Sequence, residues 1–108
     1  MAVEESNIVP LGMDNETLRR RIAQLALDSS RVVITQHAKA RMKQRGVLRT
    51  QVSHVLQKGK VVEPAHRNIH GNWQCSLEEV VAGDRIKVAA ALERSGDGEL
   101  VIVITVMN

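Results

Sequence analysis

The sequence contains no Phe and no Tyr, and Trp73 is its single aromatic residue. A hydrophobic core must therefore be assembled from Val, Leu, Ile, Ala and Met side chains. Cys75 is the only cysteine, which excludes a disulfide within the chain and gives no indication of secretion. No stretch approaches the ~20 apolar residues of a membrane-spanning helix, and the first residues lack the basic and apolar regions of a signal peptide. We therefore expect a cytoplasmic protein with no membrane partner.

Positive charge is concentrated in one part of this chain. Its 108 residues fit a single domain with one core. The net charge is +3, but it is unevenly distributed. Residues 19–60 carry eleven Lys and Arg against one acidic residue, whereas the segments on either side are acidic on balance. Such a concentration is typical of a protein with an anionic partner, nucleic acid foremost. A solvated helix surface rich in Lys and Arg is the alternative.

The first half of the sequence has the periodicity of helices. Residues 1–12 show no periodicity and are expected to form a flexible arm. Asp14 is suited to cap an amphipathic helix that extends to about residue 28. The β-branched run of residues 31–35 predicts a strand, and a helix that ends at Gly46 follows it directly.

The second half changes from helix to strand periodicity. A helix from residue 51 to residue 58 is expected, with Thr50 as its cap and Gly59 at its end. Four strands then follow: residues 60–63 broken by Pro64, 73–81, 85–93 and 100–106. The last strand is apolar on both faces, which is typical of a central strand covered on both sides. This order predicts an α+β domain over residues 13–108, with N-terminal helices packed on a mainly antiparallel sheet of four to five strands.

Three side chains on the helix before Gly46 form the most informative pattern. His37, Arg41 and Arg45 recur at four-residue intervals, which places them on one helix face. An imidazole that titrates near neutral pH beside two permanent cations is suited to holding a phosphodiester and to moving a proton during its cleavage. The alternative is a histidine at a helix start followed by two solvated arginines.

The segment ITQHAKARMKQRGV, with the later VSHVLQKGKVVE and the closing VIVITVMN, resembles a bacterial family called domain of unknown function 4258. The resemblance covers about residues 31–108. The family pattern places a His, two Arg, a Met, a Gly and a final-strand Thr on residues of this chain: His37, Arg41, Arg45, Met42, Gly46 and Thr105. The family is thought similar to the RelE/ParE-like toxins and to the wider barnase, EndoU and colicin-type ribonuclease fold. A RelE/ParE-like fold is therefore what the resemblance implies.

The resemblance also implies a function, namely a toxin-like, metal-independent endoribonuclease that cleaves RNA phosphodiesters. Its catalytic candidates are His37, Arg41, Arg45 and Thr105, although a Thr in a strand matters only if its hydroxyl points towards His37. Further cations and the lone aromatic residue are candidates for nucleic-acid contact: Lys39, Lys43, Arg49, Arg67 and Trp73. The expected partners are RNA, free or on the ribosome, an antitoxin protein, and a second copy of the chain.

Other functions stay open at this point. One is a non-catalytic module that binds nucleic acid or protein, as ParE-like relatives are thought to act on gyrase. Another is a partner-dependent assembly domain. The presence of only one imidazole in the row, with no evident second acid or base, favours such alternatives.

A metal site is not expected. His66, His70 and Cys75 come nearest to a zinc pattern, but one cysteine and two histidines leave a structural zinc site incomplete. The spacing of the two histidines suits a shared metal only on a helix, whereas Pro64 and the Gly71-Asn72 pair indicate a loop. We therefore expect no metal and no cofactor, and Cys75 is expected to be a small core residue.

Overall fold

The computed structural model describes residues 13–108, and the expected flexible arm, residues 1–12, lies outside the described residues. This part of the chain forms three α-helices, one short 3-10 helix and five strands. In chain order they are α2 (Asn15–Leu25), the 3-10 helix η2 (Ser29–Arg31), β1 (Val32–Ile34), α3 (Gln36–Arg45), α4 (Arg49–Lys58), β2 (Lys60–Arg67), β3 (Trp73–Val81), β4 (Asp84–Ser95) and β5 (Gly98–Met107). None of these helices has the length and apolar character that crossing a lipid bilayer requires.

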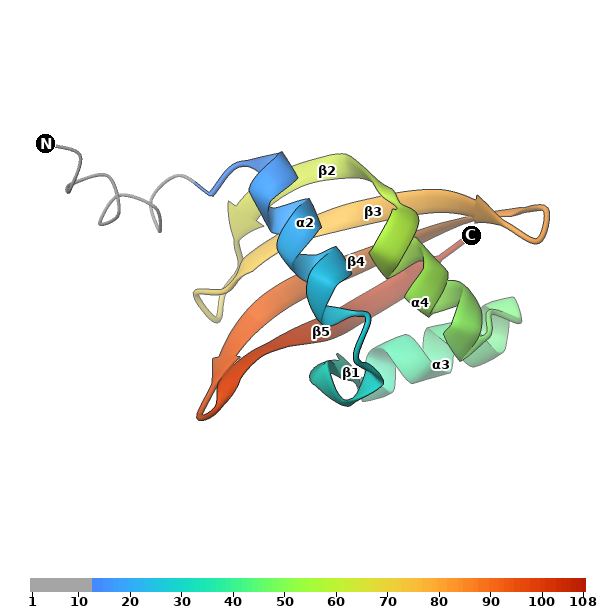
Figure 1. The fold of residues 1–108 in the computed structure, drawn as a ribbon. Helices are drawn as coiled ribbons and strands as arrows, with labels where there is room; N and C mark the ends of the chain where they lie inside the picture. The colour runs from blue at the N-terminus through green and yellow to red at the C-terminus, as the bar shows by residue number, and fades with distance from the viewer. Residues whose placement is uncertain (1–12) are drawn as a thin grey trace, which may run out of the picture.

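The strands form one five-stranded sheet in the order β1-β5-β4-β3-β2 (Figure 1). Strands β2 to β5 are an antiparallel meander, and β1 adds to its β5 side in parallel. The predicted α+β class is confirmed, with a mixed sheet. The parallel strand arises because the chain passes through α3, α4 and three strands before it returns to pair with β1.

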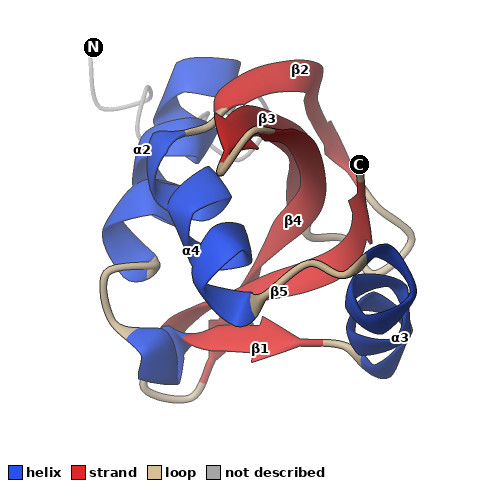
Figure 2. Cartoon of the chain, turned by 90° about the vertical axis from the view of Figure 1, so that its right-hand side faces the viewer, coloured by secondary structure: helices blue, strands red, loops and turns tan. Residues whose placement is uncertain are grey.

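Helices α2 and α4 cover one face of the sheet, whereas α3 lies beside the second half of β5 (Figure 2). The core between the sheet and the two helices consists of aliphatic side chains and one cysteine, the largest fully buried ones being Leu18, Ile22, Val52, Val55, Leu56, Cys75, Leu77, Ile86, Val88, Val101, Val103 and Val106. Alternate strand residues point the other way. We call their side of the sheet the outer face; it includes Gln74, Ser76, Ala89, Ala91, Ile102 and Ile104.

The ends of the first and second α-helices follow local chemistry. Asp14 accepts a hydrogen bond from the Thr17 N–H at 2.8 Å, which confirms the predicted cap. After α3, Gly46 has a φ of 67° and so adopts the left-handed conformation that glycine tolerates best. Both residues act through their immediate neighbours in sequence, which is why they were predictable.

The prediction that Thr50 caps the next helix is wrong. Helix α4 begins one residue earlier than Thr50, and Leu48 occupies the cap position without a capping side chain. The Leu48 N–H instead donates to Oε1 of Gln51 at 2.8 Å. A side chain in the first turn of α4, that of Gln51, therefore satisfies the backbone N–H group at the cap position. At its far end, a Cβ on Gly59 would lie 2.5 Å from the Val55 carbonyl oxygen, so only glycine fits there.

The prediction that Pro64 breaks its strand is also wrong. Strand β2 continues to Arg67, with register shifts on both sides of Glu63. β2 is an edge strand, where a proline that lacks an N–H can be accommodated. The neighbouring Ala65 N–H donates to Oδ1 of Asn15 at 2.7 Å, so α2 satisfies part of this edge.

Strand β5 is central, as its apolar sequence predicts, but only one of its faces is buried. Val101, Val103 and Val106 belong to the core, whereas Ile102 and Ile104 are partly exposed on the outer face. The expectation that both faces are covered is therefore wrong. An accessible apolar strip remains next to α3.

Candidate functional site

Thr35 fixes the start of α3 to β5. Its hydroxyl accepts a hydrogen bond from the Ala38 N–H at 3.1 Å and donates one to the Ile104 carbonyl oxygen at 3.2 Å. The Thr35 N–H donates to the Val103 carbonyl oxygen at 3.2 Å. Because Ala38 is small and fully buried, the helix can lie close to the strand. These contacts hold His37, two residues beyond Thr35, beside β5.

His37 and Thr105 form the contact at the centre of the site. Nε2 of His37 lies 3.2 Å from Oγ1 of Thr105, and the imidazole tautomer decides which group donates. His37 is exposed and Thr105 is half-buried, so a ligand can approach both. The structure therefore brings together the two residues that the resemblance placed on separate elements.

A β-bulge directs Thr105 towards His37. Ala89 pairs with Thr105 and the next residue, Ala90, pairs with Val103, which leaves Ile104 as an extra residue on β5. Such bulges change the direction of a side chain and occur frequently beside active sites. Without the extra residue, the alternation of β5 would turn the Thr105 hydroxyl to the other face of the sheet.

Arg41 and Arg45 continue the row along α3. Arg41 is half-buried, and its Nε has no hydrogen-bond partner among the described residues. Arg45 is exposed, and its carbonyl oxygen accepts a hydrogen bond from Nδ2 of Asn108 at 3.4 Å, which places it beside the end of β5. Neither guanidinium forms an ion pair within residues 13–108. Two cations without an ion-pair partner in this part of the chain therefore lie on the helix face of His37, about one and two turns beyond it.

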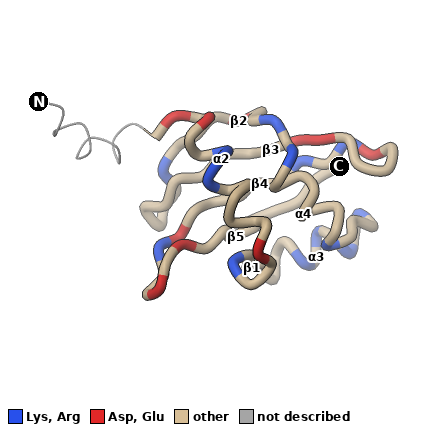
Figure 3. The backbone as a smooth tube through the Cα atoms, viewed as in Figure 1, with Lys and Arg blue, Asp and Glu red and all other residues tan. Residues whose placement is uncertain are grey.

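The remaining cations of this region surround α3 without joining the row. Lys39 and Lys43 are exposed and lie about 200° around the helix from His37 and Arg41. Arg49 is exposed at the first residue of α4. Figure 3 shows how Lys and Arg recur along α3, which has no acidic residue. The two lysines therefore give α3 positive charge on the side away from His37.

Arg67 and Trp73 lie elsewhere. They pair across β2 and β3, with Cζ of Arg67 5.2 Å from the centre of the indole ring. Trp73 points to the same side of the sheet as Cys75 and packs against the core, and its indole N–H has no partner among the residues that the structure describes. The structure does not bring this pair together with His37.

The three residues nearest to a zinc pattern, His66, His70 and Cys75, do not form a metal site in the described part of the chain. Within residues 13–108, no three His, Cys, Asp or Glu side chains lie close enough to share a metal ion. Nδ1 of His66 lies 3.1 Å from the Pro64 carbonyl oxygen. Cys75 is fully buried, and burial raises the pKa of its thiol to about 11. Cys75 is therefore a protonated core residue, as expected from its strand.

A cavity of about 620 Å³ lies on the outer face, and although neither His37 nor Thr105 lines it, Thr35 and Ile104, their near neighbours in sequence, do. Its lining includes Thr35, Asn68, Gln74, Ala91, Glu93 and Ile104. Sequence reasoning missed this outer-face cavity because its walls come from the N-cap residue of α3, from β3, β4 and β5, and from the loop after β2. The one local signal is Ala91, a small residue on the outer face of β4.

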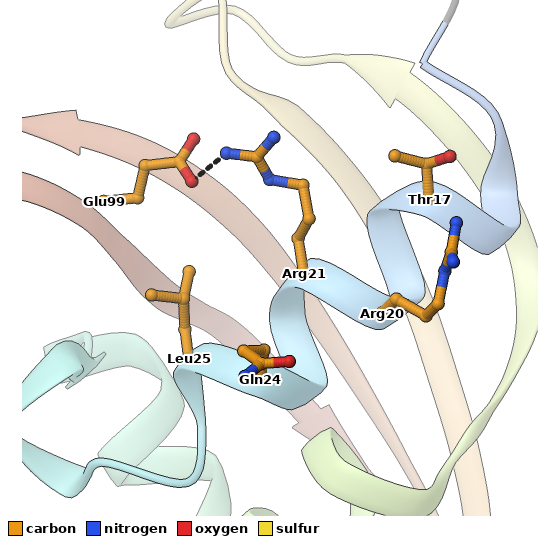
Figure 4. Close-up of a pocket in the computed structure, with 6 residues that line it drawn as sticks. All are labelled: Thr17, Arg20, Arg21, Gln24, Leu25 and Glu99. Atoms are coloured by element: carbon orange, nitrogen blue, oxygen red, sulfur yellow. Dashed lines mark hydrogen bonds and ion pairs between the residues drawn. The ribbon is translucent and has the colours of Figure 1, made fainter.

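A second cavity, of about 490 Å³, lies between α2 and the start of β5 (Figure 4). Arg21 of α2 forms an ion pair with Glu99 of β5 there, so these two charges compensate each other. None of the residues predicted for the site lines it. The α2 cavity is therefore separate from the site at His37.

The sequence model of a protein family described as Domain of unknown function (DUF4258) matches residues 34–108. The matched span contains α3, α4, the strands from β2 to β5 and every residue predicted for the site. No curated protein and no solved structure matches the chain.

Proposed function

The chain belongs to the family described as Domain of unknown function (DUF4258), and we propose that it is a metal-independent endoribonuclease of the RelE-like type. One observation carries the proposal. The His37 imidazole contacts the Thr105 hydroxyl at 3.2 Å, in an accessible position beside two arginines that no carboxylate within residues 13–108 neutralises.

In the proposed reaction, His37 accepts the proton of a ribose 2′-hydroxyl. The step uses the tautomer in which the Nε2–H group donates to Oγ1 of Thr105, which leaves Nδ1 to receive the proton. The 2′-oxygen forms a bond to phosphorus, and the bond from phosphorus to the 5′-oxygen breaks while water supplies a proton to that oxygen. The hydroxide that remains takes up the proton from His37, which restores the neutral imidazole. The products are a 2′,3′-cyclic phosphate and a 5′-hydroxyl. Arg41 and Arg45 are suited to stabilise the negative charge that grows on the phosphoryl oxygens.

A toxin role is the part of this proposal that rests on the resemblance to RelE/ParE-like proteins. It is supported by the sequence pattern around His37 and by the placement of helices before a mainly antiparallel meander. An antitoxin protein that covers α3 would block the approach to the row of His37, Arg41 and Arg45. RNA bound to the ribosome is the substrate in the alternative form of this proposal.

The test is cleavage of a defined single-stranded RNA by the purified protein with EDTA present. His37→Ala should lower the rate by about 10²- to 10⁴-fold, the usual contribution of a proton-transfer group. His54→Ala, which changes an exposed histidine of α4, is the matched control and should cut like the wild type. Fragments with 2′,3′-cyclic phosphate ends support the mechanism. Equal cleavage by His37→Ala and the wild type refutes it.

A non-catalytic module that binds nucleic acid or protein is the second candidate. One observation favours it: α3 carries a single imidazole and no carboxylate to act as a second proton-transfer group. On this alternative the protein binds single-stranded RNA and leaves it intact, whether free or on ribosomes. Binding without cleavage in both settings would select the module over the nuclease.

A further inference from the structure

We propose that the outer-face cavity binds the base of one unpaired guanine nucleotide next to the phosphodiester that is cleaved. This inference rests on the ribonuclease function proposed above. The volume of about 620 Å³ lies in the range of small-ligand sites. Its apolar floor is formed by the partly exposed Ile102 and Ile104, and Ala91, which lies beside them and is itself buried, adds no bulk to that floor.

The hydrogen-bonded loop of residues 68–72 orients the side-chain amide of Gln74 at the edge of the cavity. Oδ1 of Asn68 accepts hydrogen bonds from the N–H groups of His70 at 2.9 Å and Asn72 at 3.1 Å. Nδ2 of Asn68 donates to Oε1 of Gln74 at 3.0 Å. The carbonyl end of Gln74 is therefore engaged, and its Nε2 amino group is the end that remains to donate to a ligand.

Glu93 supplies an acceptor on the same face. Gln74 pairs with Ala91, and Glu93 lies two residues further along β4, so Gln74 and Glu93 are diagonal neighbours that both line the cavity. The Glu93 carboxylate is exposed and forms no ion pair within residues 13–108. A carboxylate can accept two hydrogen bonds, and the neighbouring amide can donate one. Together they fit a base whose pairing edge presents two N–H groups beside a carbonyl.

Guanine is the RNA base with such an edge. Its N1–H and N2–H groups can both donate to one carboxylate, while its O6 accepts from an amide. Adenine, cytosine and uracil lack two adjacent N–H donors on the pairing edge. The proposed contacts are therefore guanine N1 and N2 with Glu93, and guanine O6 with Nε2 of Gln74.

The cavity also opens at the right place for the reaction. Thr35 and Ile104 line it, and the contact of His37 with Thr105 follows directly along both elements. Arg45 lies beside Asn108 at the far end of β5, so α3 and β5 run side by side away from the cavity. A base in the cavity thus places its ribose and phosphate near His37. Arg41 and Arg45 lie further along α3, beside β5.

The test is binding of the four ribonucleoside 3′-monophosphates to the full chain, measured by calorimetry and by amide shifts in NMR spectra. Guanosine 3′-monophosphate should bind about tenfold or more tightly than the other three. The affected amides should be those of the loop at residues 68–74 and of the middle of β4 and β5. Equal binding of all four nucleotides, no binding of the guanine nucleotide, or shifts confined to other regions would overturn the inference.

Variants sharpen the result. Glu93→Gln should lose the preference for guanine, and Ala91→Leu, which fills the cavity, should lose nucleotide binding altogether. Asp84→Asn removes a carboxylate from the other end of β4 and should bind like the wild type. An unchanged preference in Glu93→Gln would remove Glu93 from the site.

Failure of this inference differs from failure of the nuclease proposal. RNA cleavage with no preference for guanine, by the wild type and by Glu93→Gln alike, overturns the cavity assignment and leaves the nuclease standing. Guanine binding without cleavage of RNA, either free or on ribosomes, supports the cavity as a guanine site and removes the nuclease.

Discussion

At the scale of single residues, a variant can isolate what the Thr105 hydroxyl does for His37. Thr105→Val keeps the shape of the side chain and removes the contact to Nε2. A hydrogen bond of this kind contributes about 1 kcal/mol, which corresponds to a fall of about fivefold in kcat/KM for RNA. Thr105→Ser keeps the hydroxyl and should retain most of the activity. Initial cleavage rates of the three proteins measure the effect.

A purely structural role for Thr105 would give another pattern. The nitrogen resonances of the His37 imidazole should change in Thr105→Val and stay close to those of the wild type in Thr105→Ser, since only the hydroxyl orients the ring. Thermal unfolding of both variants serves as the control for packing. Equal kcat/KM values for the wild type and Thr105→Val would contradict the positioning role.

At the scale of the strands, Glu63 joins β2, β3 and β4 on the outer face. Its carboxylate accepts hydrogen bonds from Oγ of Ser76 at 2.7 Å and from Nζ of Lys87 at 3.2 Å. The Ser76 hydroxyl, followed by Lys87, holds the pKa of Glu63 below its ordinary value. The native state thus favours the ionised form. Its contribution to the free energy of unfolding is present above the ordinary pKa of about 4.3 and is lost as the pH falls through the lowered value.

Glu63→Gln should therefore be less stable than the wild type near neutral pH, and the difference should shrink in acid below about pH 4. Denaturant unfolding followed by circular dichroism across this range measures it. Glu79→Gln on β3 changes a carboxylate outside the Ser76 and Lys87 contacts and serves as the control. A stability difference that stays constant down to about pH 3 would show that ionisation of Glu63 does not contribute to the free energy of unfolding.

The elements differ in how far the sequence predicts them. α3 and its row of side chains follow from periodicity and from Gly46, which are local signals. The bulge at Ile104 depends on how β5 pairs with β4, and nothing in a run of Val and Ile marks it. Likewise, a proline such as Pro64 interrupts a central strand but can be accommodated in an edge strand. Whether β2 is central or at the edge depends on the order of strands in the sheet, which the sequence does not state.

The site shows the same division. The row of His37, Arg41 and Arg45 was predictable because one helix carries it. The approach of Thr105 came only from the family resemblance, since β5 and α3 are brought together by tertiary packing. The outer-face cavity could not be predicted, because Gln74, Glu93 and Ile104 become neighbours only when the sheet is assembled.

At the scale of the whole molecule, positive charge collects on α3, which carries two arginines and two lysines and no acidic residue. If RNA follows β5, Arg41 and Arg45 contact phosphates, whereas Lys39 and Lys43 lie on the far side of the helix. Each phosphate contact with a single strand adds about 0.7 to the slope of log affinity against log salt concentration. The slope therefore reports which side of α3 the RNA follows.

Replacing both Arg41 and Arg45 by Gln should reduce this slope by about 1.4. Replacing both Lys39 and Lys43 by Gln removes the same charge from the same helix and should change the slope much less. Fluorescence anisotropy of a labelled single-stranded RNA over a series of NaCl concentrations measures both, with His37→Ala in every protein to prevent cleavage. Equal reductions from the two pairs would mean that RNA is attracted by the net charge of α3 and is not held along β5. Such a result would favour a binding surface centred on the helix over a catalytic site at His37 and Thr105.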